Sequence, residues 1–114
     1  MKMSFENRGG VGLLRVDEAR LDASVAIQFK DRFRDLTGQA QGDVILDLSR
    51  VDFLDSSGLG AVVAARKLLG EGRVLELAGL TPAVDKVMTL TRMCTVFPIH
   101  ADLDTALASR AAVP

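Results

Sequence analysis

Short apolar runs separated by glycines and polar residues form one of two hydropathy patterns in this chain. Between residues 3 and 16, Gly9 and Gly10 stand between two such runs, which predicts a β-hairpin that turns at the two glycines. Further strands are predicted at 43–49, 73–79 and 95–100. Pro98 has no backbone N–H to donate, so the last of these strands is expected at an edge or an end of the sheet.

Apolar residues at helical spacing form the second pattern. Helices are predicted between an Asp22 cap and Gly38, at 59–69, within 81–92 and within 101–112. Thr81 and Pro82 suit the cap and the first position of the third helix, and Asp102 suits the cap of the fourth. Two strands followed by alternating helices and strands predict an α/β fold in which helices pack against a mixed sheet.

The predicted helix at 59–69 carries two apolar stripes. Its larger apolar residues are expected to pack on the sheet: Leu59, Val62 and Val63. Its smaller residues are expected nearer the surface, where small side chains let a partner approach the helix closely: Gly60, Ala61 and Ala64.

The composition is that of one folded domain. The chain has 114 residues, 48% of them hydrophobic, which is enough for a single core and predicts one domain over residues 1–114. A formal net charge of −1 argues against nucleic acid or an anionic membrane as the partner. No apolar run is long enough to cross a bilayer and the start does not resemble a signal peptide, so the protein is expected in the cytoplasm. The single cysteine, Cys94, excludes an internal disulfide.

The segment Asp-Ser-Ser-Gly-Leu-Gly at 55–60 joins an apolar run to a helix and is the candidate functional element. A serine hydrolase needs a nucleophile, an acid and a histidine, and Ser56, Asp85 and His100 occur in that chain order. Leu54, however, occupies the position where the G-x-S-x-G elbow requires its first glycine. The sequence therefore argues against hydrolysis.

Two other kinds of site receive little support. A Walker A loop ends in Gly-Lys-Ser/Thr, whereas Lys67 lies inside the predicted helix. A carboxylate metal site would need several acidic residues to converge, and turn or cap roles are the more ordinary interpretation of the candidates: Asp22, Asp47, Asp52 and Asp55. No cofactor is implied.

A serine at the start of a helix can itself be a substrate. Phosphorylation adds about −1.5 to −2 charges and three acceptor oxygens, and the free N–H groups of a helix N-terminus can hold them. Capping is the commonest task of a serine at a strand-to-helix junction. The residues alone leave both roles open for Ser56.

The stretch ILDLSRVDFLDSSGLGAVVAARKLL at 45–69 resembles the signature of the STAS domain, specifically that of bacterial anti-sigma factor antagonists. RLDA at 20–23 and the segment at 79–99 are similar to further parts of the family sequence, so the resemblance extends over the whole chain. It implies a four- or five-stranded mixed sheet with helices mainly on one face.

The resemblance implies a switch between partners rather than catalysis by this chain. The unphosphorylated protein is expected to bind an anti-sigma factor of the histidine-kinase-like ATPase fold, which frees the sigma factor. That partner is expected to phosphorylate Ser56, and a serine phosphatase to restore it. The partner-binding surface is expected to comprise Asp22, Asp55, Ser56, Ser57, Gly58, Gly60, Ala61 and Ala64.

STAS domains also serve as subunits of ABC-type lipid transport systems and as tails of anion transporters. In the alternative for this chain, the domain is bound permanently in such an assembly and Ser56 is only a helix cap. The intact Asp-Ser-Ser-Gly motif and the lack of predicted membrane spans favour the switch protein.

Overall fold

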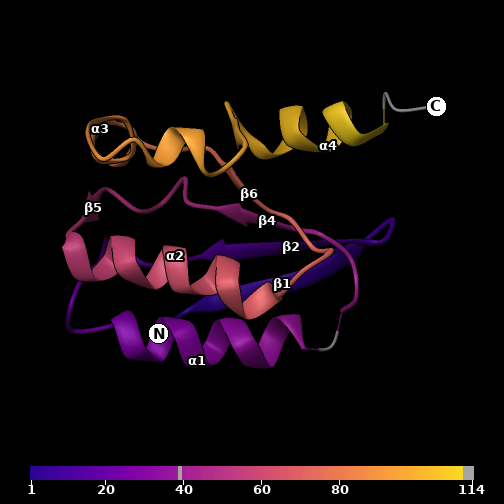
Figure 1. The fold of residues 1–114 in the computed structure, drawn as a ribbon, viewed down its shortest axis with the longest axis horizontal. Helices are drawn as coiled ribbons and strands as arrows, with labels where there is room; N and C mark the ends of the chain where they lie inside the picture. The colour runs from indigo at the N-terminus through magenta and orange to yellow at the C-terminus, as the bar shows by residue number, and fades with distance from the viewer. Residues whose placement is uncertain (39, 112–114) are drawn as a thin grey trace.

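A five-stranded mixed sheet runs through the middle of the molecule (Figure 1). The computed structural model describes residues 1–38 and 40–111. In sheet order the strands are β1 (Met3–Arg8), β2 (Val11–Val16), β4 (Val44–Asp47), β6 (Leu75–Ala78) and β7 (Ile99–His100). The β1–β2 hairpin turns at Gly9 and Gly10 as predicted, and the other neighbouring strands pair in parallel. The predicted α/β fold with a mixed sheet is confirmed.

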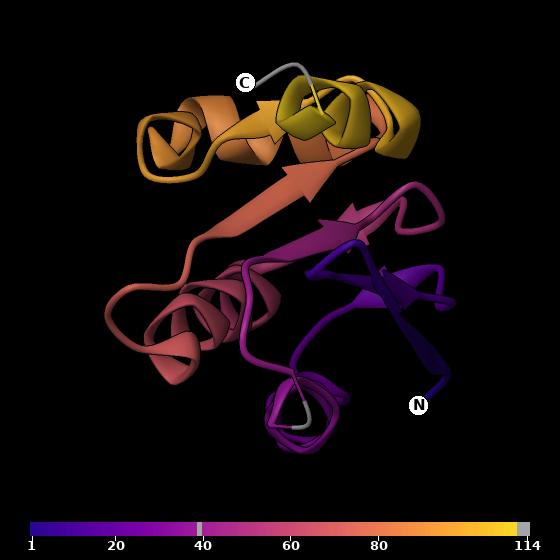
Figure 2. The ribbon, with the colours of Figure 1, turned by 90° about the vertical axis from the view of Figure 1, so that its right-hand side faces the viewer.

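Helices lie on both faces of this sheet and mainly on one of them, as the resemblance implied. They are α1 (Ala26–Thr37), α2 (Ser56–Leu69), α3 (Pro82–Leu90) and α4 (Leu103–Ala111), with a short 3-10 turn, η1 (Met93–Thr95). α1 and α2 lie side by side against one face, and α4 lies against the other (Figures 1 and 2). None of the helices in the described part of the chain is both long enough and apolar enough to cross a membrane.

Each sheet face has its own core, because successive residues of a strand point to opposite faces. On the α1–α2 side, Phe29 and Phe33 of α1 pack with Leu46 of β4, and α3 adds Met88 to this larger cluster. The smaller cluster lies beneath α4, around Ala106. Its strand members are Val11, Leu13, Ile45 and Ala78.

The start of α1 differs from the prediction. Asp22 is not its N-cap: the cap is Val25, and an Asp22 oxygen accepts the Ser24 N–H at 3.0 Å instead. Asp22 therefore closes a turn ahead of the helix. Gly38 follows the last helical residue, as predicted.

The predictions for the last two helices hold at their starts. Pro82 occupies the first turn of α3, and the Asp102 carboxylate accepts the Thr105 N–H at 2.7 Å at the start of α4. Thr81 is the N-cap residue of α3, but its hydroxyl donates to the Val51 carbonyl at 2.7 Å rather than capping the helix. The predicted last helix extended to Ala112, which lies outside the described residues. Strand β7 is at the sheet edge, after Pro98, and is shorter than predicted.

Candidate functional site: the start of helix α2

A second, two-stranded sheet sets the position of the α2 N-terminus. Its strands are β3 (Arg20–Leu21) and β5 (Phe53–Leu54). They pair in parallel with Leu21 opposite Leu54, and both leucines are buried. An aspartate follows each strand directly, so Asp22 and Asp55 lie next to each other at the same end of this small sheet.

The Asp55 carboxylate joins the two helices at this end of the molecule. One oxygen accepts the Gly58 N–H at 2.8 Å, which makes Asp55 the N-cap of α2. The other oxygen accepts the Ala23 N–H at 3.2 Å, in the loop that leads into α1. Asp55 is therefore held in place by two backbone donors.

Gly58 lets the first turn of α2 approach the backbone of β3. The residue is buried, and a Cβ atom placed on it would lie 1.9 Å from the Leu21 carbonyl oxygen. No side chain fits in that space. Gly58, which the sequence predicted to be part of the partner-binding surface, is buried against β3 and is therefore not accessible for direct contact.

Ser56 and Ser57 occupy the first two positions of α2, and both are exposed. The interpretation of Ser56 as the helix cap is wrong, because Asp55 takes that role. The Ser56 hydroxyl makes no hydrogen bond with any residue that the structure describes. The first N–H groups of a helix have no acceptor within the helix, and those of Ser56 and Ser57 belong to this set in α2.

The assignment of the two α2 stripes is wrong at Ala61. This residue is only 2% exposed, whereas Gly60 is exposed and Ala64 is half-buried. Val62 is buried as predicted, but Leu59 and Val63 are only half-buried. α2 packs on α1 as well as on the sheet, so burial extends around the helix beyond its largest side chains.

Asp22, the neighbour of Asp55, forms polar contacts of its own. The Ser24 hydroxyl donates to Asp22 at 2.6 Å and holds the pKa of that carboxyl below its usual value, and Arg20 contributes at 3.2 Å. The Arg20 guanidinium also lies 3.9 Å from the centre of the Phe53 ring, across the small sheet. Sequence reasoning missed this pairing, although the parallel triplets Arg-Leu-Asp and Phe-Leu-Asp were a signal for it.

The model of the STAS domain family matches residues 2–106. The chain belongs to the STAS domain family. The anti-sigma F factor antagonist of Paenibacillus polymyxa is 23% identical to it, over 94% of this chain and 92% of the relative. The crystal structure of an anti-sigma factor antagonist from Mycobacterium paratuberculosis is 26% identical, with a TM-score of 0.83 over 95% of this chain and 92% of that one.

The fold of this STAS domain is also that of the Bacillus anti-sigma factor antagonist SpoIIAA, solved in two forms. The unphosphorylated form has a TM-score of 0.74 at 23% identity, covering 99% of this chain and 100% of that one. The phosphorylated form has a TM-score of 0.66 at 21% identity, covering 95% and 98%. The predicted STAS architecture, with its mixed five-stranded sheet, is confirmed.

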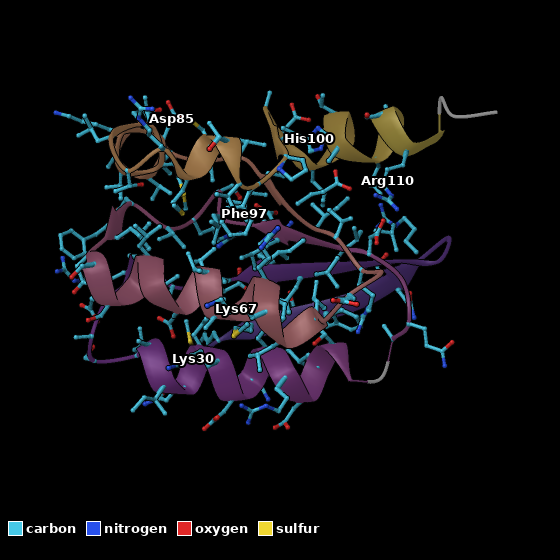
Figure 3. The ribbon with its side chains drawn as sticks, viewed as in Figure 1. Lys30, Lys67, Asp85, Phe97, His100 and Arg110 are labelled. Carbon is cyan, nitrogen blue, oxygen red and sulfur yellow. The ribbon has the colours of Figure 1, made fainter. Side chains whose placement is uncertain are left out.

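The STAS domain does not bring the hydrolase candidates together. His100 Nε2 lies 2.5 Å from a Glu76 oxygen on the α4 side of the sheet, whereas Ser56 opens a helix on the other side. Asp85 lies on α3, apart from His100 (Figure 3). In the part of the chain that the structure describes, neither His100 nor Asp85 is placed to act as a general base on the Ser56 hydroxyl.

The four aspartates considered for a metal site do not gather in one place. Asp47 pairs with Arg15 at 3.2 Å within the main sheet, whereas Asp22 and Asp55 follow the small sheet. Within residues 1–38 and 40–111, no three His, Cys, Asp or Glu side chains are grouped so that they could hold a metal ion.

Proposed function

We propose that this STAS domain is an anti-sigma factor antagonist that works by switching partners. Unphosphorylated, it binds an anti-sigma factor of the histidine-kinase-like ATPase fold and so frees a sigma factor. Phosphorylation of Ser56 by that partner ends the complex, and a serine phosphatase restores the binding form. The observation that carries this proposal is the exposed Ser56 at the start of α2, relieved of capping by Asp55.

Relatives support the same role. The Paenibacillus and Mycobacterium proteins are both named anti-sigma factor antagonists, and each aligns over nearly the whole of this chain. SpoIIAA shares the fold and exists in an unphosphorylated and a phosphorylated form. A family in which one member is phosphorylated supports the interpretation of the free hydroxyl as a phosphate acceptor.

The helix start tolerates a phosphate on Ser56 without unfolding. The N–H groups of Ser56 and Ser57 are available to its oxygens, and a negative charge near a helix N-terminus is stabilising by about 0.3–1 kcal/mol. Opposing this, Asp55 is adjacent and its carboxylate is held by two N–H groups, so it cannot turn away. The two effects act in opposite directions, and the fold is expected to change little.

The same charge acts differently inside a protein interface. A partner packed over the α2 start would have to desolvate about two additional charges beside Asp55. Like charges placed together at an interface cost several kcal/mol, which lowers affinity by well over tenfold. The proposed contact surface is Asp22, Asp55, Ser56, Ser57, Gly60 and Ala64, with Gly58 and Ala61 supporting it from beneath.

Mass spectrometry tests the modified residue. The chain is incubated with Mg-ATP and the kinase-like protein encoded beside it, then digested with trypsin. The fragment from 51 to 66 contains both serines, so fragment ions must separate Ser56 from Ser57. One phosphate on Ser56, lost in Ser56→Ala and kept in Ser57→Ala, is the expected result. Phosphate on Ser57 alone, or none, contradicts the proposal.

Calorimetric titration with the same partner tests the switch. Ser56→Ala should bind like the wild type, and Ser56→Asp should bind at least tenfold more weakly. Ser109→Asp, an exposed change of equal charge on α4, is the matched control and should bind like the wild type. Equal affinities of Ser56→Asp and Ser109→Asp would mean that Ser56 does not control the complex.

A further inference from the structure

Helix α4 makes little apolar contact with the sheet beneath it. Among the α4 side chains that the structure describes, Ala106 is buried, whereas Leu103 and Leu107 are only half-buried. The strand residues under them form the smaller of the two cores: Val11, Leu13, Ile45 and Ala78. None of the described α4 residues belongs to the larger core on the other sheet face. Hydrophobic stabilisation is roughly proportional to the apolar area removed from water, so apolar packing holds α4 less firmly than it holds α1 and α2.

A charged contact ties the last turn of α4 to the sheet. Figure 3 shows the Arg110 side chain on the side of α4 that faces the sheet. One guanidinium nitrogen of Arg110 lies 2.7 Å from an oxygen of Asp43, just before β4, and another donates to Glu76 of β6. The other oxygen of Glu76 lies 2.5 Å from His100 Nε2. Arg110 therefore joins α4 to two neighbouring strands at once.

The α4 helix can separate from the sheet at a small cost to the rest of the fold. Asp43 and Arg110 are partly exposed, with side-chain exposures of 24% and 34%, so dissolved salt can screen this pair. Glu76 keeps His100 as a hydrogen-bonding partner when Arg110 leaves. Only two residues, Ala101 and Asp102, lie between β7 and α4, and such a short connection can act as a hinge.

We propose that α4 is a detachable cover, which opens as a unit while the rest of the domain stays folded and whose closure depends on Arg110. When closed, α4 shields the strand residues of the smaller core from water. When open, it exposes them together with the carboxylates of Asp43 and Glu76. This surface lies on the opposite face of the sheet from α1 and α2 (Figure 2), so it is separate from the surface proposed for the switch.

Native-state amide hydrogen exchange of the full chain, followed by NMR, tests whether α4 opens separately. The amides of 106–110 should exchange through an opening of lower free energy than the amides of 44–47 in β4. Urea below the unfolding transition should accelerate exchange at 106–110 much less, because opening α4 exposes little surface. The same opening free energy and the same urea dependence at both places would show that α4 opens only when the whole domain unfolds, which would overturn the proposal.

Two variants and a change of salt test the role of Arg110. Arg110→Met keeps a long side chain without its charge and should speed exchange at 106–110 at least about tenfold. Arg66→Met, the same change at an exposed position of α2, is the matched control and should alter that rate less than about twofold. Raising the salt concentration from about 0.05 to about 0.5 M should speed exchange at 106–110 in the wild type but not in Arg110→Met. A smaller effect of Arg110→Met, an equal effect of Arg66→Met, or the same salt response in the wild type and Arg110→Met would overturn the role of Arg110 in closing α4.

Discussion

Two glycines in one helix provide the sharpest test of how the α2 start is built. A Cβ on Gly58 would lie 1.9 Å from the Leu21 carbonyl oxygen, whereas a Cβ on Gly60 meets nothing within 4 Å. Gly→Ala in an unobstructed helix stabilises by about 0.5–1 kcal/mol, and Gly60→Ala should gain that amount. In Gly58→Ala, α2 must move away from β3, which costs about 1–3 kcal/mol in strained packing.

The same movement weakens both hydrogen bonds of Asp55. Losing the cap bond to Gly58 costs about 0.5–2 kcal/mol, and losing the bond from Ala23 about 0.5–1.5 kcal/mol. After subtraction of the gain in helix propensity, Gly58→Ala should lose about 1–6 kcal/mol of unfolding free energy.

Urea unfolding followed by far-ultraviolet circular dichroism measures the difference, since the chain contains no Trp or Tyr for fluorescence. The gain in helix propensity is common to both variants, so they should differ by at least about 2 kcal/mol at similar m-values. If Gly58→Ala is as stable as Gly60→Ala, the close approach of α2 to β3 is not a feature of the folded protein.

Further predictions concern the serine, the helix side and one ion pair. Ser56→Ala should change the unfolding free energy by less than about 0.5 kcal/mol, because the side chain is exposed and does not cap the helix; a loss above about 1 kcal/mol in thermal melts would show a structural role. Ala61→Arg should lose more than about 2 kcal/mol in urea unfolding, since Ala61 is 2% exposed; a variant as stable as the wild type would show that this side of α2 is open. Burial raises the pKa of Asp43, but the hydrogen bond from the Val74 N–H and the pairing with Arg110 outweigh it, so the pKa is below its ordinary value of 3.8. The stabilisation that comes from this lowered pKa is complete above the ordinary pKa and is lost as the pH falls through the folded pKa. Asp43→Asn should therefore flatten the acid side of a plot of unfolding free energy against pH. An unchanged slope there would contradict this account.

Local patterns in the sequence were sufficient to predict most of the strands and helices of the fold. The turn at Gly9 and Gly10, the strands around Leu46 and Leu77, and the edge position after Pro98 depend on neighbouring residues, on hydropathy or on a missing N–H. These properties belong to short stretches of chain, so they can be predicted without knowing what packs against them. The Asp-Ser-Ser-Gly segment could be chosen as the candidate functional element for the same reason.

The contacts within that element depend on segments far apart in the sequence. Two-residue strands such as β3 and β5 are too short to show a hydropathy period, and they form because Leu21 and Leu54 are buried side by side. Only that pairing places the Ala23 N–H within reach of Asp55.

Similar small residues along α2 also have different roles for reasons that composition cannot reveal. Gly58 faces the β3 backbone and Gly60 faces solvent, although both are glycines two positions apart. Ala61 is buried and Ala64 is half-buried. A residue's own properties set which backbone shapes and contacts it permits, and the sequence alone was enough to predict strands, helices and the exposed motif. Whether a small side chain is enclosed or accessible depends on which element lies opposite it, and only the packing of α2 on β3, α1 and the sheet decided that.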